Sequence, residues 1–371
     1  MEKQLPETQR IFGLDILRAI AILTVLFRHM FSDVPLKTSE IVVDSLYLNG
    51  VEIFFVLSGY LVGGILFRTI TKKGPYFKTL FEFWRDRWLR TLPAYYVVLC
   101  IIIAFSVIWT HKSIFDFKYL FIFSENLNGR HFIGFFESWS LAVEEWFYLV
   151  TPLLLIIAAR IWPLRKAAPV IIVIVFLFSN AVRIYRVYKY GMVTPGPDTA
   201  DLISTYIASS VPTRIDNIMF GVLGAYLNFY DFKIWTEKRN AFFIIGITGY
   251  LCNHFYSVFS GFNLYNLLFQ KQVELLFILM TIPKVITFTE GKGAIARLIT
   301  FIATISYSIY LVHMTIFEFA VRPRFPNNIW IQLPAYYLWA FGGACLLHIT
   351  VEKWGLDVRR KLKTYTIGNK K

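Results

Sequence analysis

Apolar residues in this chain gather in runs of about 20 residues, and the runs recur along nearly its whole length. A helix of that length crosses the roughly 30 Å hydrocarbon core of a bilayer. The runs lack the alternation of apolar and polar positions that outer-membrane β-barrel strands show. We therefore expect an all-α, polytopic membrane bundle with about ten transmembrane helices. The predicted spans are residues 12–31, 47–67, 93–110, 138–159, 168–186, 211–229, 241–259, 271–289, 298–319 and 332–351.

The composition supports a membrane protein rather than a soluble one. The mean hydropathy is +0.54, and hydrophobic residues make up 56% of the chain, far more than a soluble domain of this size carries. The first apolar run contains Asp15 and Arg18 and has no small-residue cleavage site after it, so it is expected to stay rather than to be removed as a signal peptide. No segment is long enough to fold as a soluble module, so residues 1–371 are expected to form a single integral-membrane domain without a fused extracytoplasmic domain.

The basic residues indicate topology rather than nucleic-acid binding. The net charge is +14, but the chain offers no soluble basic domain that would dock on a duplex, so we expect no nucleic-acid partner. An even number of spans places both termini in the cytoplasm, and the positive-inside rule agrees with that orientation in a bacterial cytoplasmic (inner) membrane. Lys and Arg then gather in the cytoplasmic segments 68–90, 160–166, 233–239 and 284–297 and in the tail from Lys353.

Two other sequence features bear on the site. Arg183, Arg186 and Lys189 lie at the expected outer end of the fifth span, where they either line a water-filled vestibule for an anionic substrate or show that the span is misplaced. The three cysteines are widely spaced in or beside apolar runs, which gives neither a metal-ligand spacing nor a disulfide framework. We expect no metal site.

The first span carries two ionisable side chains on one helical face, Arg18 and His29. Eleven residues make about three turns, so the two lie roughly 16 Å apart along the helix axis. Such residues inside a membrane are costly and are therefore functional candidates by default. The alternative is that Asp15 and Arg18, three residues apart, neutralise each other as a buried pair.

The expected outer half of the bundle collects acids, bases and one cation. This composition suits deprotonation of a hydroxyl group and stabilisation of an oxyanion. Arg214 and Asp216 are two residues apart and cannot face each other on a helix, so each is expected to have a partner on another span. His313 alternatively acts as a hydrogen-bonding contact between helices. The ionisable residues placed in this half are His29, Glu52, Glu144, Glu145, Arg214, Asp216 and His313.

The expected inner side offers a basic and aromatic segment just before Pro93. Guanidinium groups there suit a phosphorylated ligand such as coenzyme A, because they pair with phosphate bidentately. The plainer interpretation is an interfacial anchor against anionic lipid. The segment contains Trp84, Arg85, Arg87, Trp88 and Arg90. In the second span, Ser58 and Gly59 are either part of a small-residue helix contact or a loosened turn that faces a ligand.

Six motifs in order resemble the membrane acyltransferase-3 family, whose members O-acylate extracytoplasmic glycans. The match covers nearly the whole chain. The motifs are Leu14–Leu23 with the Arg18-to-His29 spacing, Ile53–Leu61, Arg85–Pro93, Ser138–Tyr148, Arg214–Gly221 and Ser306–His313. Three departures are visible: Tyr60 stands where Phe is usual, Trp146 where Gln is usual, and Trp354 where Pro is often found. These departures bear on the acceptor or the acyl chain more than on the type of reaction.

The resemblance implies a ten-helix domain that takes an acyl group, commonly acetyl, from cytoplasmic acyl-CoA and delivers it to a sugar hydroxyl beyond the membrane. Arg18 and His29 are then the expected essential pair, and Glu144 is the acidic residue of the Trp-Ser-Leu motif. The arginines before Pro93 are the expected acyl-CoA contacts. Acyl-CoA is a donor substrate here, and no bound cofactor is expected. Many relatives carry a fused extracytoplasmic domain. This chain is expected to lack one, so its bundle is expected to act alone or with a separate extracytoplasmic partner.

These inferences combine into one hypothesis. His29 acts as general base, or as a transient acyl carrier, while Arg18 orients the thioester and Glu144 raises the basicity of the imidazole. Arg214, or backbone amides near Ser58 and Gly59, stabilises the oxyanion. The acceptor is a carbohydrate or glycolipid: a polysaccharide, an exopolysaccharide or a lipopolysaccharide O-antigen. The alternatives are a proton-coupled transporter or flippase of a polysaccharide or lipid-linked sugar, and an acyl-lipid scaffold without turnover.

Overall fold

The chain folds as a set of helices, and every regular element in the part described is helical. The computed structural model describes residues 10–31, 45–72, 76–110, 117–129, 134–192, 196, 198–320, 322–324 and 328–368. By their internal contacts the residues divide into two compact units. The first unit comprises Met1–Gly74, Glu125–His131 and Trp139–Ala303, and the second comprises Pro75–Ser124, Phe132–Ser138 and Thr304–Lys371.

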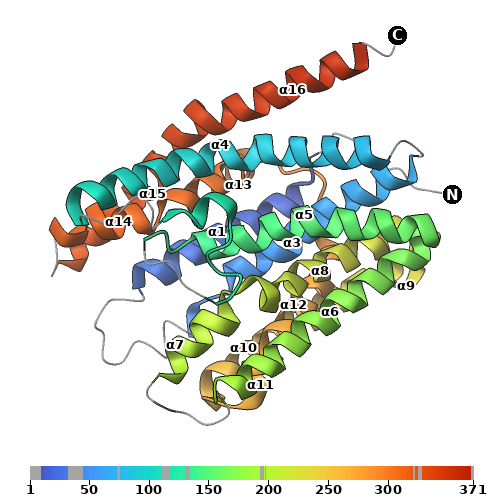
Figure 1. Ribbon diagram of the computed structural model, residues 1–371, viewed down its shortest axis with the longest axis horizontal. Helices are drawn as coiled ribbons and strands as arrows, with labels where there is room; N and C mark the ends of the chain where they lie inside the picture. The colour runs from blue at the N-terminus through green and yellow to red at the C-terminus, as the bar shows by residue number, and fades with distance from the viewer. Residues whose placement is uncertain are drawn as a thin grey trace. The chain divides into compact units, whose positions relative to one another are not determined.

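The first unit contains six long helices before α12, joined in part by short ones. Its elements are α1 (Phe12–Phe31), α3 (Gly50–Thr71), α5 (Ser138–Ile161), α6 (Leu164–Lys189), α7 (Thr199–Ile203), a π-turn η3 (Ser204–Ala208), α8 (Val211–Phe229), α9 (Lys233–Glu237), α10 (Arg239–Ser260), α11 (Leu264–Leu268) and α12 (Gln270–Val285). Helix α8 lies along α3 and α6, and α10 lies along α12 (Figure 1). The candidate site is carried by α1, α3, α5 and α8.

The second unit is built around α4 (Tyr76–Thr110), which continues unbroken through Pro93. The third predicted span therefore does not begin at this proline: the basic segment before it and the apolar segment after it form one helix. The other elements are η2 (Leu120–Ile122), α14 (Thr315–Ala320), η4 (Arg322–Arg324), α15 (Ile329–Leu347), a π-turn η5 (His348–Glu352) and α16 (Lys353–Gly368). The boundary between the units falls within α13 (Gly293–Val312).

Each of the ten predicted spans overlaps at least one helix, and six of the described helices are long and apolar enough to cross a membrane. The six are α3, α4, α5, α6, α10 and α13. Helix α1 is not among them, and it carries three charged side chains, Asp15, Arg18 and Arg28. On α6 the apolar side chains of Leu177 and Phe178 are more than half exposed, as is typical of a helix that faces lipid.

The predicted ninth span, 298–319, is two helices rather than one. Helix α13 ends at Val312 and α14 begins at Thr315. The break has a physical cause, because the Glu137 carboxylate accepts hydrogen bonds from the backbone N–H groups of Met314 (3.0 Å) and Thr315 (2.8 Å). A carboxylate bound to N–H groups at the start of a helix acts as an N-terminal cap.

Candidate active site

The carboxylate of Asp15 on α1 binds two guanidinium groups. Arg10 Nε donates to Asp15 Oδ2 at 2.5 Å, and Arg18 Nη1 lies 3.4 Å from Oδ1. The predicted pair of Asp15 and Arg18 is therefore present, but Arg10 is the closer partner. Two guanidinium groups thus share one buried carboxylate.

The other end of α1 carries His29, three turns from Arg18 on the same helix. The side chain is partly buried. Its neighbour Arg28 places its guanidinium 5.3 Å from the ring centroid of Tyr47, which precedes α3. This cation–π contact joins the end of α1 to the segment that leads into α3.

Helices α3 and α8 approach so closely that only glycine fits at the crossing. A Cβ atom on Gly59 would lie 1.9 Å from the carbonyl oxygen of Ile218, and one on Gly221 would lie 2.1 Å from that of Val56. Gly59 therefore belongs to a small-residue helix contact, not to a loosened turn that faces a ligand. The substrate-binding role predicted for Gly59 lacks the space that it requires.

Ser58, next to Gly59, points to a different partner. Its Oγ lies 2.7 Å from the hydroxyl oxygen of Tyr148, and that hydroxyl donates to Glu144 Oε2 at 2.9 Å. Tyr148 is only 3% exposed. A hydrogen-bonded chain thus connects α3 to the acidic residue of α5. Glu145 lies beside Glu144 on the same helix and is also partly buried.

A buried ion pair between Glu52 and Arg214 joins α3 to α8. Asn217 Nδ2 donates to the second oxygen of Glu52 at 3.0 Å. The rings of Phe55 and Trp139 flank the Arg214 guanidinium, with centroids 5.8 and 5.6 Å from Cζ. The Nε atom of Arg214 is buried, and no described residue accepts a hydrogen bond from it. Such an orphaned donor costs about 1–3 kcal/mol unless a ligand oxygen satisfies it.

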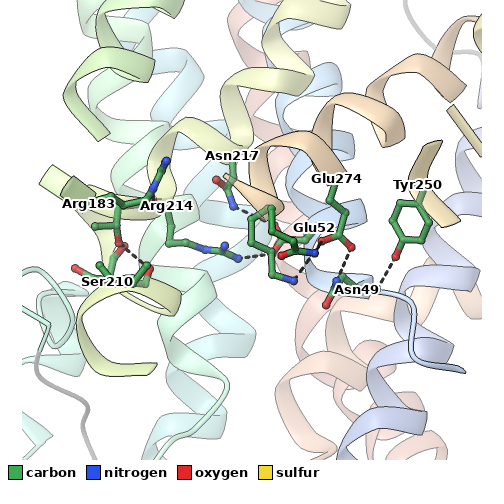
Figure 2. A network of polar contacts seen from close by, with 12 residues as sticks. Asn49, Glu52, Arg183, Ser210, Arg214, Asn217, Tyr250 and Glu274 are labelled. Carbon is green, nitrogen blue, oxygen red and sulfur yellow. Dashed lines mark hydrogen bonds and ion pairs between the residues drawn. The ribbon is translucent and has the colours of Figure 1, made fainter. Parts of the chain in front are cut away.

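A second buried carboxylate extends this network (Figure 2). Glu274 on α12 is fully buried and accepts hydrogen bonds from Asn49 and from Gln270 Nε2, the latter at 3.1 Å. Tyr250 on α10 accepts from the backbone N–H of Asn49 at 3.0 Å. These contacts fix the backbone three residues before Glu52, and so they hold the α3 end of the Glu52–Arg214 pair in place.

Arg183 and Arg186 on α6 do not line a vestibule. Arg183 is 2% exposed and pairs with Asp216, while its Nε donates to the backbone oxygen of Thr213 at 3.0 Å. Arg186 is 8% exposed, and its Nη1 donates to Ser210 Oγ at 2.5 Å. Helix α6 continues to Lys189, three residues beyond the predicted end of the fifth span. Arg214 and Asp216 each find a partner on another helix, as their spacing predicts.

His313 lies in the second unit, at the break between α13 and α14. Its ring is fully buried, with Nδ1 2.8 Å from the backbone oxygen of Tyr310 and 4.0 Å from Glu137 Oε1. Burial raises the pKa of the Glu137 carboxyl to about 7, although hydrogen bonds from Thr315 and Met314 oppose the shift. His313 thus belongs to the group that shapes the helix break.

The predicted acyl-CoA arginines lie on α4, also in the second unit. Arg85 donates to Asp86 Oδ1 from Nε at 3.2 Å and from Nη2 at 2.9 Å. The indole rings of Trp84 and Trp88 are stacked with centroids 6.0 Å apart. Arg87 and Arg90 occupy positions on the same helix and are partly buried. The segment is thus both basic and aromatic, as either predicted role requires.

A family profile described as an acyltransferase domain, Acyl_transf_3, matches residues 11–349 of the chain. The chain belongs to this acyltransferase family. With its long apolar helices, this member of the family is a multi-pass membrane protein.

Curated relatives of this acyltransferase include three bacterial proteins. Peptidoglycan O-acetyltransferase OatA of Listeria monocytogenes is 27% identical over 88% of this chain and 53% of its own length. O-acetyltransferase OatA of Staphylococcus aureus is 29% identical over 38% and 24%. Putative peptidoglycan O-acetyltransferase YrhL of Bacillus subtilis is 30% identical over 48% and 29%. The chain thus spans about half the length of the Listeria relative, and the matches to the other two cover less than a third of their lengths. No solved structure matches it.

Three residues of the candidate site were missed or left unpaired in the prediction from sequence. Tyr148 follows Glu144 by four residues, a spacing that places both on one helical face and is a usable signal. Glu52 was placed near Arg214 but not paired with it, because no local spacing connects α3 and α8. Asn217, which also binds Glu52, gave no signal beyond being a polar residue in an apolar run.

Proposed function

We propose that this chain is a membrane O-acetyltransferase of the bacterial cytoplasmic membrane. It transfers an acetyl group from acyl-CoA to a hydroxyl of an extracytoplasmic polysaccharide of the peptidoglycan type. The observation that carries the proposal is the family match over residues 11–349, together with relatives that are described as O-acetyltransferases. The polar groups of the first unit supply the base, the acid and the hydrogen-bond donor that the reaction needs.

In the proposed reaction the acceptor hydroxyl oxygen forms a bond to the thioester carbonyl carbon. His29, the general base, removes the hydroxyl proton. The carbon–sulfur bond then breaks, and the coenzyme A thiolate leaves and takes up a proton. Glu144 holds the imidazole in the tautomer that accepts this proton, the role of a carboxylate beside a catalytic histidine.

The oxyanion donor in this proposal is Arg214 rather than the backbone near Gly59. The amide of Gly59 lies inside α3, and the α8 backbone covers that side of the helix. Arg214 instead keeps a buried Nε–H without an acceptor among the described residues. A substrate oxygen that becomes negatively charged in the transition state would satisfy this donor, and such preorganised donors give large rate effects.

The donor side of the proposal rests on basic residues. Arg18, which shares Asp15 with Arg10, orients the thioester or the pantetheine arm. Arg85, Arg87 and Arg90 on α4 bind the phosphates of coenzyme A, because guanidinium pairs with phosphate bidentately.

The test is acetyl transfer by purified protein in proteoliposomes, with labelled acetyl-CoA and a peptidoglycan fragment as acceptor. His29→Ala is expected to lose at least a hundredfold in turnover while inserting normally, since general-base catalysis contributes about that much or more. Lys233→Ala, at an exposed position of α9, serves as the matched control. Near wild-type activity of His29→Ala would remove the core of the proposal, and proton-dependent sugar movement without acetyl-CoA would favour a transporter instead.

A further inference from the structure

The first turns of α16 contact the basic part of α4 within the second unit, and the helix then diverges from α4 (Figure 1). The contact is close at Gly355, where an added Cβ would lie 2.4 Å from the backbone oxygen of Leu89. Leu89 stands between Arg87 and Arg90 in the sequence. The small residue at the start of α16 therefore lets this helix approach α4 at the segment predicted to bind acyl-CoA.

The approach places Arg359 of α16 beside the arginines of α4. Arg359 Nε lies 3.7 Å from Asp86 Oδ2, while Arg85 binds the other oxygen of the same carboxylate. Burial lowers the pKa of Arg359, the positive charges of Arg90 and Arg85 lower it further, and Asp86 opposes both. Arg85 and Arg359 thus share one carboxylate, and Arg90 adds a third positive charge that acts on Arg359.

This group carries two more positive than negative charges and is only partly exposed. The side chains of Arg85 and Arg359 are 22% and 28% exposed, and that of Asp86 is 17% exposed. Like charges at this degree of burial repel each other more strongly than in bulk water. A bound anion would offset the repulsion, and the planar guanidinium groups suit phosphate oxygens.

We propose that α16 contributes Arg359 to a phosphate-binding site formed with Arg85 and Arg90 around Asp86, and that the phosphates are those of the acyl-CoA donor. Asp86 orients Arg85 and Arg359, and the remaining N–H groups of the three arginines bind the ligand. The inference rests on the proposed function for its ligand. It adds that the helix following the last predicted span is part of the donor site.

Anionic lipid headgroups present the same phosphate chemistry, so the experiment must separate the two sources. The protein is reconstituted in nanodiscs of zwitterionic phosphatidylcholine and, in a second arm, in nanodiscs that also contain phosphatidylglycerol. In each arm the KM for acetyl-CoA and kcat are measured, and binding of free coenzyme A is measured by calorimetry.

Arg359→Gln is compared with Arg360→Gln. Arg360 is the next residue, pairs with Asp357 on its own helix and is 75% exposed, so its replacement removes the same charge from the same helix. Loss of one charge-assisted phosphate contact is expected to raise KM and the dissociation constant about tenfold or more for Arg359→Gln in both lipid arms, with kcat within about twofold. Arg360→Gln is expected to stay within about twofold of wild type.

Equal values for Arg359→Gln and Arg360→Gln in an active protein would overturn the inference and leave the proposed function intact. An effect of Arg359→Gln seen only with phosphatidylglycerol would also overturn it, in favour of a lipid site. Wild-type protein that neither binds coenzyme A nor uses acetyl-CoA would instead refute the proposed donor. Where Arg359→Gln does not fold, Arg359→Lys decides: it keeps the charge without the planar fork, so a several-fold rise in KM supports the site and an unchanged KM contradicts it.

Discussion

The buried arginines of the first unit and the arginine cluster of the second unit handle positive charge in different ways. Two deep arginines of the first unit each have their own carboxylate: Arg214 pairs with Glu52, and Arg183 pairs with Asp216. These arginine side chains are only 6% and 3% exposed. In the second unit, by contrast, Arg85 and Arg359 share the carboxylate of Asp86, and the charge of Arg90 also acts on Arg359.

The difference follows from the cost of desolvating a charge. An unpaired ion in a low-dielectric interior costs several kcal/mol, so deep arginines require a partner each. Groups that keep partial contact with solvent tolerate an excess of positive charge. A neutral pair such as Glu52–Arg214 is suited to donate a hydrogen bond to a developing charge, whereas the cluster around Asp86 is suited to recruit an anion. This contrast supports the proposal that Arg214 takes part in acyl transfer and that the arginines near Asp86 bind the acyl donor.

Breaking the deep pair should have the largest effect. Glu52→Gln leaves the buried Arg214 charge without its counter-ion, and it is expected to destabilise the protein by about 3–5 kcal/mol. The measurement is the thermal unfolding midpoint and the fraction of monodisperse protein in detergent. Glu237→Gln, which removes an exposed carboxylate on α9, is the control and is expected to change stability by less than about 0.5 kcal/mol.

A double replacement separates stability from chemistry at the same pair. Glu52→Leu combined with Arg214→Met removes both charges together, and apolar replacements of buried ion pairs are often neutral or stabilising. We expect this double variant to recover folded protein but not acetyl transfer, because the Arg214 donor is gone. Acetyl transfer at the wild-type rate would show that the pair is purely structural.

The close approach of α3 and α8 is what buries that pair, so widening it should have the next largest effect. Gly59→Ala places a methyl group against the Ile218 carbonyl, and it is expected to cost about 1–3 kcal/mol or more. Gly64→Ala, on the same helix, is the control, because its added Cβ has no atom nearer than Arg68 Nη2 at 3.8 Å. Equal stability of the two variants would contradict a glycine-dependent crossing.

The sequence predicts the helices better than it predicts their contacts. Apolar runs located helical segments at all ten predicted positions, because the length of a membrane-crossing helix is set by the bilayer. Their ends were less well predicted. The break after Val312 depends on Glu137, a residue far away in the sequence, and the continuity of α4 through Pro93 overrides the usual tendency of proline to begin or end a helix.

The sequence also predicted several ionisable residues of the candidate site, but it did not predict most of the residues that they contact. A charge in an apolar run is conspicuous, so Arg214, Asp216 and Glu144 could be selected without a structure. The partner of a charge lies on another helix, and no local pattern reports which one. Arg359 is an example, because it lies in a basic tail whose composition is typical of a solvent-exposed segment. Only the close approach of α16 to α4 at Gly355 brings Arg359 to Asp86.

Glu137 represents a third arrangement, a buried carboxylate held by N–H and O–H groups. Its pKa is raised to about 7 by burial, above its usual value of 4.5, so between these values the folded protein binds more protons than the unfolded chain. The free energy of unfolding should therefore fall as pH rises from about 4.5 to about 7 and level off above. Glu137→Gln mimics the neutral form and should flatten this part of the profile, measured as the unfolding midpoint from pH 5 to 8. His313 is present in both proteins, and identical slopes would contradict the assignment.

The smallest loss of stability is expected at Glu144 of the first unit, whose carboxylate accepts a hydrogen bond from the neutral hydroxyl of Tyr148. Tyr148→Phe removes the link between Ser58 and Glu144 and should cost about 1 kcal/mol of stability, because one buried hydrogen bond is lost. Tyr95→Phe provides a match, since the Tyr95 hydroxyl is equally buried and donates to the Leu120 carbonyl at 2.9 Å. If Glu144 orients His29, Tyr148→Phe should also lower kcat several-fold and shift the pH profile of kcat, whereas Tyr95→Phe should leave both unchanged. A Tyr148→Phe variant with the stability loss alone would make the hydroxyl chain a structural contact and would leave Glu144 to position the imidazole without it.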